Sequence, residues 1–391
     1  NIKASNTNGV ANYNLKANGA SINTAAATAS YAFNHTNITG NQNYELEVTQ
    51  GTTTIVKKFT AVVSPTVVSE TIPAGLVDGI NYNPNDATKA TLVLDAPLKD
   101  FVYVAGSFNN WQPTAAYAMK KDASAGSTKF WLELTGLTAG TNYTYQYWVV
   151  DQTPLAGSPS LVKAADPYST LVLSPYDDGG IPATSFPNLP AYPSGQEREV
   201  TWFKTGQTPY AWSQATLNFV KPAKEKLVVY EVLVRDFDAR RNFQDLIDKI
   251  DYFKNLKVNA IQLMPVMEFE GNESWGYNTS FHMALDKFYG TPEKLKELID
   301  LYHQNGIAVI LDVALNHAFG RNSMVRMWMN DPDGDGFGSP TTENPYFNTV
   351  AKHSYSVGED FNHQQARTKN YVKRVIKQWV EEFKIDGFRW D

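Results

Sequence analysis

From Lys226 to Asp391, apolar runs of strand length alternate with segments that repeat apolar residues at helical spacing. Continuous apolar runs are typical of parallel strands covered on both faces. Strands that alternate with helices require crossover connections, which are right-handed and produce a parallel sheet. Four such strands are half of an eight-stranded barrel or most of a doubly wound sheet. The expected strands are residues 227–234, 258–266, 307–313 and 385–391.

The preceding residues predict β-structure of a different kind. Residues 44–63 alternate apolar and polar around a Gln50-Gly51 turn, which predicts a β-hairpin. Short strands separated by Gly- and Asn-rich turns then favour a β-sandwich. We therefore expect a partial β-sandwich module at 1–68, an immunoglobulin-like sandwich at 69–175, a Pro-rich connector at 176–222 and the parallel α/β region at 223–391, with an insertion at about 318–362.

Composition excludes several classes of function. The 34 Lys and Arg residues against 40 Asp and Glu give a net charge of −6, which disfavours nucleic acid and anionic membranes as partners. No apolar run is long enough to span a bilayer. The absence of cysteine excludes disulfides and thiol catalysis. Aromatic residues make up 13% of the chain, which suits either sugar binding or sandwich cores.

Polar residues stand at the ends of two expected parallel strands. The third strand leads into Asp312 and His317, and the fourth ends in Arg389 and Asp391. Active sites of parallel barrels lie at these carboxyl ends. Because side chains alternate along a strand, Arg389 and Asp391 share a face and are expected to point into the barrel mouth. An arginine next to an aspartate favours the ionised carboxylate that a nucleophile requires, although a structural ion pair is the alternative.

The strand ends resemble known signatures. Residues 312–317 (DVALNH) and 387–391 (GFRWD) resemble the first and second signature regions of the α-amylase family, glycoside hydrolase family 13. Residues 275–278 (WGYN) and 286–292 (DKFYGTP) resemble the stretch after the second strand of that family. The resemblance implies a multidomain protein with the first half of a (β/α)8 TIM barrel and an insertion after its third strand.

The resemblance also implies a role for each matched residue. Asp391 matches the nucleophile that forms a covalent glycosyl-enzyme, Arg389 the arginine that orients it, His317 a sugar-binding histidine, Tyr277 a tyrosine that stacks on the sugar, and Asp312 a buried acid; Trp275 is a further candidate for substrate binding. Retaining chemistry needs a second carboxyl group about 5 to 5.5 Å from the nucleophile. In the family this acid is a glutamate after the fifth strand, so we expect it beyond Asp391 and expect residues 1–391 alone to be inactive.

Candidate metal ligands occur at three places, and calcium is the expected cofactor. Closely spaced carboxylates with glycines can wrap this cation. For residues 331–336 a solvated turn of Asp and Gly is the alternative. The acid that would close a calcium loop here, Glu343, lies one position later than the calcium-loop pattern requires. The candidates are Asn316 and the looser match of Asp360 and Asn362, implied by the family resemblance, and Asp331, Asp333 and Asp335, which resemble the start of a calcium loop.

Residues 104–111 (VAGSFNNW) resemble the sandwich that precedes the barrel in starch-debranching and branching enzymes, carbohydrate-binding module family 48. Trp111 either stacks on a glucan or anchors the edge of the sandwich, and the second reading is favoured. The whole resemblance covers about residues 90–391. Residues 1–65 match no family beyond a generic β-module.

We therefore expect a retaining hydrolase that acts on α-1,4-glucans such as starch, glycogen or maltodextrins. A debranching (pullulanase-type) or cyclodextrin-cleaving enzyme of the same family is the near alternative. A non-catalytic glucan-binding protein and an adhesin built from β-modules are the alternatives of other classes. By analogy, a polymer substrate and tandem modules suggest a secreted, periplasmic or cell-surface bacterial protein.

Overall fold

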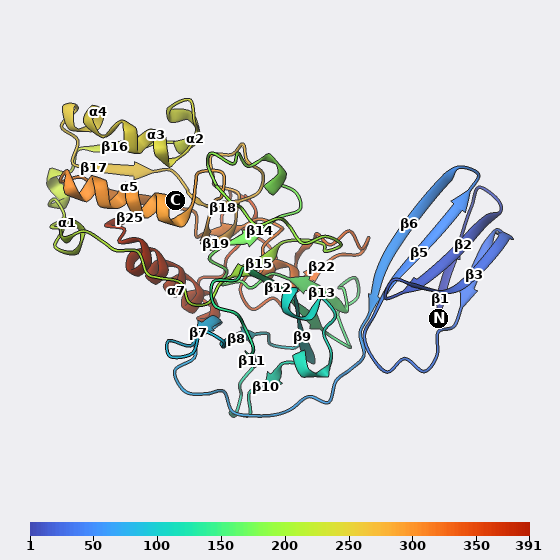
Figure 1. Cartoon of the computed structure of the whole chain (residues 1–391). Coiled ribbons are helices and arrows are strands. Elements are labelled where there is room, and N and C mark those ends of the chain that lie inside the picture. Colours follow the sequence, from blue (N-terminus) through green and yellow to red (C-terminus); the bar gives the residue numbers. More distant parts are fainter. The chain divides into compact units, whose positions relative to one another are not determined.

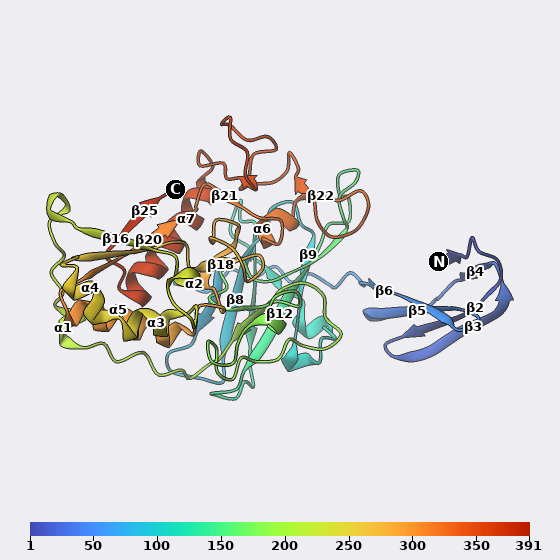
Figure 2. The same cartoon turned by 90° about the horizontal axis from the view of Figure 1, so that it is seen from above.

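The computed structural model describes residues 1–391, and the protein is multidomain and rich in sheets (Figures 1 and 2). It divides into two compact units. The first unit comprises Asn1–Val67 and Gln112–Ala118, and the second comprises Val68–Trp111 and Met119–Asp391. No helix is both long and apolar enough to cross a membrane.

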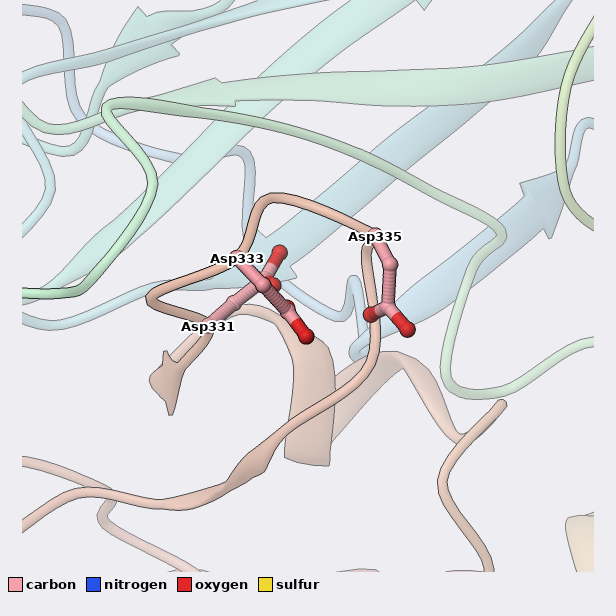
Figure 3. A group of neighbouring side chains, drawn as sticks. All are labelled: Asp331, Asp333 and Asp335. Atoms are coloured by element: carbon pink, nitrogen blue, oxygen red, sulfur yellow. The ribbon is translucent and has the colours of Figure 1, made fainter.

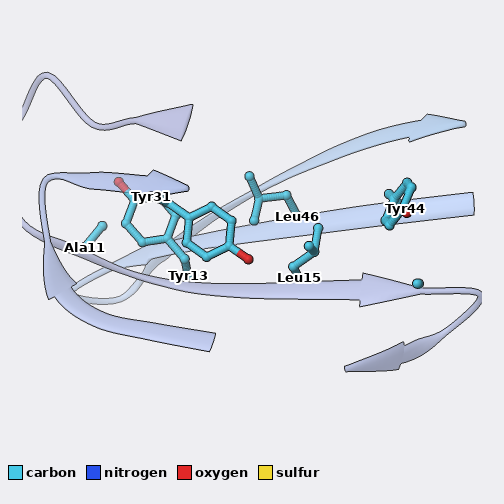
Figure 4. Close-up of a cluster of buried hydrophobic side chains, with 7 residues drawn as sticks. Ala11, Tyr13, Leu15, Tyr31, Tyr44 and Leu46 are labelled. Atoms are coloured by element: carbon cyan, nitrogen blue, oxygen red, sulfur yellow. The ribbon is translucent and has the colours of Figure 1, made fainter. Parts of the chain in front are cut away.

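The first unit is an antiparallel sheet with strand order β3-β2-β5-β6, beside a two-stranded pair of β1 and β4. The predicted hairpin is confirmed, because β5 and β6 pair through Gln50 and Thr53 around the turn. Tyr13 and Tyr31 stack in the core at 5.3 Å between ring centroids (Figure 4). The strands are β1 (Ile2–Ser5), β2 (Ala11–Ala17), β3 (Ala20–Thr28), β4 (Ser30–Phe33), β5 (Gln42–Gln50) and β6 (Thr53–Ala61).

The second unit begins with two antiparallel sheets, of order β10-β11-β8-β7 and β13-β12-β15-β14, with β9 also paired to β12. Tyr145 and Tyr147 each donate a hydrogen bond of 2.8 Å to the buried Asp166, whose pKa burial raises to about 6. The strands are β7 (Gly79–Tyr82), β8 (Ala90–Asp95), β9 (Phe101–Gly106), β10 (Lys120–Lys121), β11 (Lys129–Leu134), β12 (Tyr143–Val150), β13 (Leu161–Ala164), β14 (Val172–Leu173) and β15 (Val200–Phe203). Short 3-10 turns of this unit lie at Ser107–Asn109, Asp178–Gly180 and Lys224–Lys226, and a further one, Ala115–Tyr117, belongs to the first unit.

The four strands predicted after Lys226 form one parallel sheet of order β16-β17-β20-β25. These strands are β16 (Val229–Val232), β17 (Ala260–Leu263), β20 (Ala308–Val313) and β25 (Gly387–Trp390). Within residues 1–391, β16 is the outermost strand of this sheet, and Val229 is 44% exposed.

Helices connect these strands. Thr291 begins α5 by accepting a hydrogen bond from the backbone N–H of Lys294, as its position before Pro292 predicts. The apolar stripe at residues 243–253 is divided between α3 and α4, because Lys249 leaves the helical conformation. The helices are α1 (Gln214–Leu217), α2 (Val234–Phe237), α3 (Phe243–Asp248), α4 (Ile250–Asn255), α5 (Pro292–Gln304), α6 (Ser323–Arg326) and α7 (Ala366–Phe383).

Short antiparallel pairs form the loops at the carboxyl ends of the parallel strands. His317 of β21 pairs with Asp360 of β24, and this pairing brings the end of the insertion back to the end of β20. The remaining pairs join β18 to β19 and β22 to β23. Their bounds are β18 (Met267–Phe269), β19 (Thr279–Leu285), β21 (His317–Ala318), β22 (Met329–Asn330), β23 (Ser339–Pro340) and β24 (Glu359–Asp360).

Candidate active site

The ends of β20 and β25 place Asp312 and Arg389 side by side, because the two residues are register partners in the parallel sheet. Nη1 of Arg389 donates to Oδ1 of Asp312 at 3.1 Å and also to Oδ1 of Asp391. Asp312 is buried, whereas the side chains of Arg389 and Asp391 are 44% and 32% exposed. Arg389 and Asp391 therefore share one face, as strand alternation predicts.

Tyr277 completes this group of side chains from the loop between β18 and β19. Its hydroxyl donates to Oδ2 of Asp312 at 2.7 Å. Burial raises the pKa of Tyr277, and the hydrogen bond to Asp312 adds to the shift. Burial also raises the pKa of Asp312, while the bonds from Tyr277 and Arg389 partly offset that effect. We call Tyr277, Asp312, Arg389 and Asp391 the strand-end cluster.

The loop that carries Tyr277 is fixed by two local features. Gly276 has a φ of +92°, and a Cβ at this position would collide with the backbone carbonyl of Pro265, so only glycine fits. Nε2 of His317 donates to the backbone carbonyl of Tyr277 at 2.6 Å. Desolvation lowers the pKa of the buried His317, and this hydrogen bond only partly offsets the shift. The structure therefore favours a neutral His317 that holds the loop in place.

Asn316 joins the end of β20 to the backbone of Asp391. Its Nδ2 donates to the Asp391 carbonyl at 3.2 Å, and its own backbone carbonyl accepts from Phe361 at 2.9 Å. Its buried Oδ1 has no hydrogen-bond partner. Asn316 is thus in contact with both the strand-end cluster and the insertion.

Two of the three side chains in the calcium set that the resemblance implies accept hydrogen bonds within the protein. Oδ1 of Asp360 accepts from His353 at 3.1 Å, and Oδ2 accepts from Asn348 at 2.7 Å. The side-chain oxygen of Asn362 accepts from the backbone N–H of Gln364. Oδ1 of Asn316 has no hydrogen-bond partner, and calcium binding by Asn316, Asp360 and Asn362 stays a prediction.

The other metal candidates form a separate group. One carboxylate oxygen from each of Asp331, Asp333 and Asp335 lies within 4.8 Å of the others (Figure 3). No hydrogen bond or ion pair joins these side chains to the strand-end cluster. The structure therefore separates the predicted aspartate loop from the predicted catalytic residues.

The two tryptophans predicted to bind substrate differ in exposure. Trp275 lies two residues before Tyr277 and is 62% exposed, so its ring is open to a ligand. Trp111 is only 9% exposed, and its backbone N–H donates to the Gly106 carbonyl. The assignment of Trp111 to substrate binding is therefore corrected, because a buried ring cannot stack on a sugar. Its burial supports the structural reading.

Two further histidines, His282 and His303, are buried and packed against other residues. His282 is fully buried and its Nε2 donates to the backbone carbonyl of His317 at 3.1 Å. Burial lowers the pKa of His282 to about 4, so its ring is neutral near pH 7. His303 is also buried and contacts Asp386 at 2.8 Å.

Sequence reasoning missed a buried ionic group that supports the loop of Tyr277. Lys287 is 1% exposed and pairs with Glu268 of β18, and its Nζ lies 3.4 Å from Asp178 in the connector. The adjacent Asp286 accepts from two backbone N–H groups, and burial raises its pKa to about 7. The available signal was that Asp286 and Lys287 directly follow the apolar strand β19 in the sequence. Because buried charges are nearly always paired, such a position predicts a buried ionic group.

Comparison with known proteins gives one family match, in which residues 236–347 match the α-amylase catalytic domain. Malto-oligosyltrehalose trehalohydrolase of Saccharolobus solfataricus is 33% identical over 178 residues, which is 44% of this chain and 28% of that protein. Alpha-amylase 3 of Dictyoglomus thermophilum is 31% identical over 193 residues, which is 44% of this chain and 37% of that protein. The matched part of the chain thus spans about a third of these curated relatives.

Solved structures extend the similarity of fold. A putative alpha amylase from Salmonella typhimurium has a TM-score of 0.57 at 22% identity, over 80% of this chain and 43% of that one. The Group B Streptococcus pullulanase SAP has a TM-score of 0.58 at 19% identity, over 97% of this chain and 50% of that one. The same pullulanase has also been solved in complex with maltotetraose. The resemblance to the α-amylase family predicted from the motifs is confirmed.

Proposed function

We propose that this protein, whose residues 236–347 match the α-amylase catalytic domain, is a retaining hydrolase of α-1,4-linked glucans. One observation carries the proposal: Arg389 holds Asp391 beside Asp312 and Tyr277 at the carboxyl ends of neighbouring parallel strands. The names of the relatives, which include an amylase, a trehalohydrolase and branching enzymes, support a glucan as substrate.

The proposal includes a domain assignment. The parallel sheet β16-β17-β20-β25 with its helices is assigned to the first half of a TIM barrel at 223–391, and the strand order along the chain supports this assignment. The antiparallel sheets are assigned to a sandwich similar to carbohydrate-binding module family 48, and this sandwich includes β15 (Val200–Phe203) in addition to strands from residues 69–175. Residues 1–68 are assigned to a separate β-module, and the rest of 176–222 is assigned to a connector between the sandwich and the barrel.

Asp391 is proposed as the nucleophile. One of its oxygens is held by Arg389. The bond to Asp391 is the main cause of a raised pKa for Arg389, so the guanidinium stays charged beside the carboxylate. The carboxylate would attack the anomeric carbon while a second carboxyl group protonates the leaving oxygen. Water would then hydrolyse the covalent glycosyl-enzyme. The resemblance assigns the acid to a glutamate later in the protein than Asp391.

The surrounding residues are proposed to bind and position the sugar. The hydroxyl of Tyr277 is held by Asp312, which fixes the ring for stacking, and the exposed Trp275 extends the binding surface. The hydrogen bond implied between His317 and the sugar would compete with the bond that its Nε2 already makes to Tyr277. We therefore assign His317 first to positioning the Tyr277 loop.

The test is Asp391→Asn in the whole protein. The substitution preserves shape and removes the attacking charge, so we expect kcat on amylose to fall by about a thousandfold or more, as for loss of a catalytic group acting in the transition state. Glucan binding, measured by affinity electrophoresis, should change little. A variant that still releases reducing ends at the normal rate would refute the assignment. A native protein that binds glucans without cleaving any would favour the non-catalytic alternative.

A debranching activity is the second candidate, because the pullulanase structures match over 97% of this chain. Pullulan contains α-1,6 links between maltotriose units, so release of maltotriose from pullulan without cleavage of amylose would favour this candidate. Preferential cleavage of amylose would favour the first one. A starch-like polymer is too large to enter a cell, so we also propose an exported or cell-surface protein. Cell fractionation tests this location.

A further inference from the structure

A turn between β22 and β23 brings together three acidic side chains outside the strand-end cluster. Asp331, Asp333 and Asp335 occupy the first, third and fifth positions of this turn, and one oxygen from each lies within 4.8 Å of the others (Figure 3). Gly334 and Gly336 have φ values of +72° and +83°, so the backbone folds back on itself. We call residues 331–336 the aspartate loop.

No salt bridge joins these carboxylates to a protein cation, although the buried Arg326 attracts Asp331 electrostatically. Arg198 contacts the backbone carbonyl of Asp335, and Nε of Arg326 donates to the carbonyl of Gly336 at 3.3 Å. Neither arginine forms an ion pair with a side chain of the aspartate loop. Three carboxylates at this separation repel one another unless a counter-ion lies between them.

Asp331 carries an independent sign of a missing partner. The residue is only 8% exposed, and its buried Oδ1 has no hydrogen-bond partner. Its Oδ2 accepts from the backbone N–H of Gly336 at 2.9 Å. A buried carboxylate oxygen without a donor is costly, so its burial beside two further carboxylates points to a bound cation.

We propose that the aspartate loop binds a calcium ion through one carboxylate oxygen of each of its three aspartates. Calcium accepts six to eight oxygen ligands in flexible geometry, and water completes its shell where the protein supplies few. A calcium loop that begins with this spacing places a bidentate acid at the twelfth position, but that position is Thr342 here. The missing acid predicts a weak site, in the range of about 10⁻⁴ to 10⁻³ M that is typical of extracellular modules.

The proposed ion would fasten the insertion to the antiparallel sheets. The backbone N–H of Asp331 donates to the carbonyl of Gly157, in the turn between β12 and β13, at 2.6 Å. Arg198 precedes β15 and reaches the carbonyl of Asp335. Calcium would hold the loop in the shape that these two contacts need. The inference depends on this loop alone and holds whether or not the proposed catalysis is correct.

Calcium titration of the whole protein, freed of metal with EDTA, tests the proposal. Isothermal titration calorimetry should give one site, and thermal unfolding should shift to higher temperature as calcium increases, because a ligand that binds only the folded state stabilises it. Asp333→Asn and Asp335→Asn should each weaken binding by about tenfold, since affinity follows the charge of the ligands. Both positions are exposed, so these variants should fold normally.

The matched control is Asp251→Asn on α4. The side chain of Asp251 is 82% exposed and pairs only with the neighbouring Lys254, so this variant should bind calcium like the native protein. Absence of any calcium-dependent shift in the native protein would overturn the proposal. Equal binding by the native protein and both loop variants would do so as well. An equal effect of magnesium would reject calcium as the selected ion.

Discussion

The strand-end cluster and the aspartate loop are both rich in carboxylates, but they neutralise charge in opposite ways. In the cluster, Arg389 contacts both Asp312 and Asp391, and Tyr277 donates to Asp312 as well. In the loop, no arginine or lysine pairs with a carboxylate, and Asp331 keeps a buried oxygen without a partner. The strand-end cluster is therefore organised before any ligand binds. The aspartate loop leaves the negative charge of its carboxylates for a ligand to neutralise.

Arg389→Leu should produce the largest effect, because it removes the cation from both carboxylates of the cluster. We expect loss of hydrolysis by about a thousandfold and a fall of about 2 kcal/mol in the free energy of unfolding. Breaking a fully buried ion pair typically costs about 3–5 kcal/mol. We expect a smaller loss here because the side chain of Arg389 is 44% exposed, so water screens its interaction with the two carboxylates. Urea unfolding and reducing-end assays measure the two quantities.

The matched control for Arg389 is Arg240→Leu, which removes a 53% exposed arginine from Asp245 and Asp248. Exposed ion pairs contribute little, so the expected loss is below about 1 kcal/mol. If both variants lose the same stability, the cluster is an ordinary surface network and the contrast with the aspartate loop disappears.

Acid should destabilise the region behind the strand-end cluster through His282. The pKa of this residue is about 4 in the folded protein, because of burial, against 6.5 for the free side chain. The unfolded chain therefore binds the proton first, and the contribution of His282 to stability is full above pH 6.5 and lost as the pH falls towards 4. At most about 3 kcal/mol is involved.

NMR titration of the His282 ring checks this prediction directly. Its resonances should still report a neutral imidazole at pH 5.5, whereas a histidine with an unshifted pKa would be largely protonated there. A midpoint near 6.5 for His282 would mean that the ring is hydrated, and would contradict the tight packing behind the cluster.

Tyr277→Phe should have a smaller effect. It removes one hydrogen bond to a carboxylate and keeps the ring, so we expect a loss of about 1.5 kcal/mol in unfolding free energy. KM should change less than kcat, because the stacking surface remains. The exposed Tyr355 provides the control, since Tyr355→Phe removes a hydroxyl from an 83% exposed side chain and should be neutral. Equal stability of the two variants would show that the bond to Asp312 contributes nothing.

Asp333→Asn should have the smallest effect on stability, and its sign should depend on calcium. Without calcium the substitution relieves repulsion in the loop, so the protein should be more stable by up to about 0.5 kcal/mol. With calcium in excess the order should reverse, because the native loop binds the ion more tightly. Thermal unfolding with EDTA and with added calcium gives both values. A variant that is less stable in EDTA would contradict the picture of unpaired charges.

Several elements could be predicted because their signals are local. The hairpin of β5 and β6 follows from alternation around Gly51, and α5 begins where Thr291 precedes Pro292. The apolar spacing of residues 243–253 indicates helix but does not reveal the break at Lys249 that divides it into α3 and α4.

The sequence by itself determined that strand and helix alternate, and that Arg389 and Asp391 lie on one face two residues apart. Both follow from periodicities that each segment carries within itself. Only the tertiary structure decided that Tyr277 reaches Asp312, that Asp360 is satisfied by protein donors, and that Trp111 is buried. Burial and hydrogen-bond partners depend on residues that are distant in the chain, so no local pattern determines them.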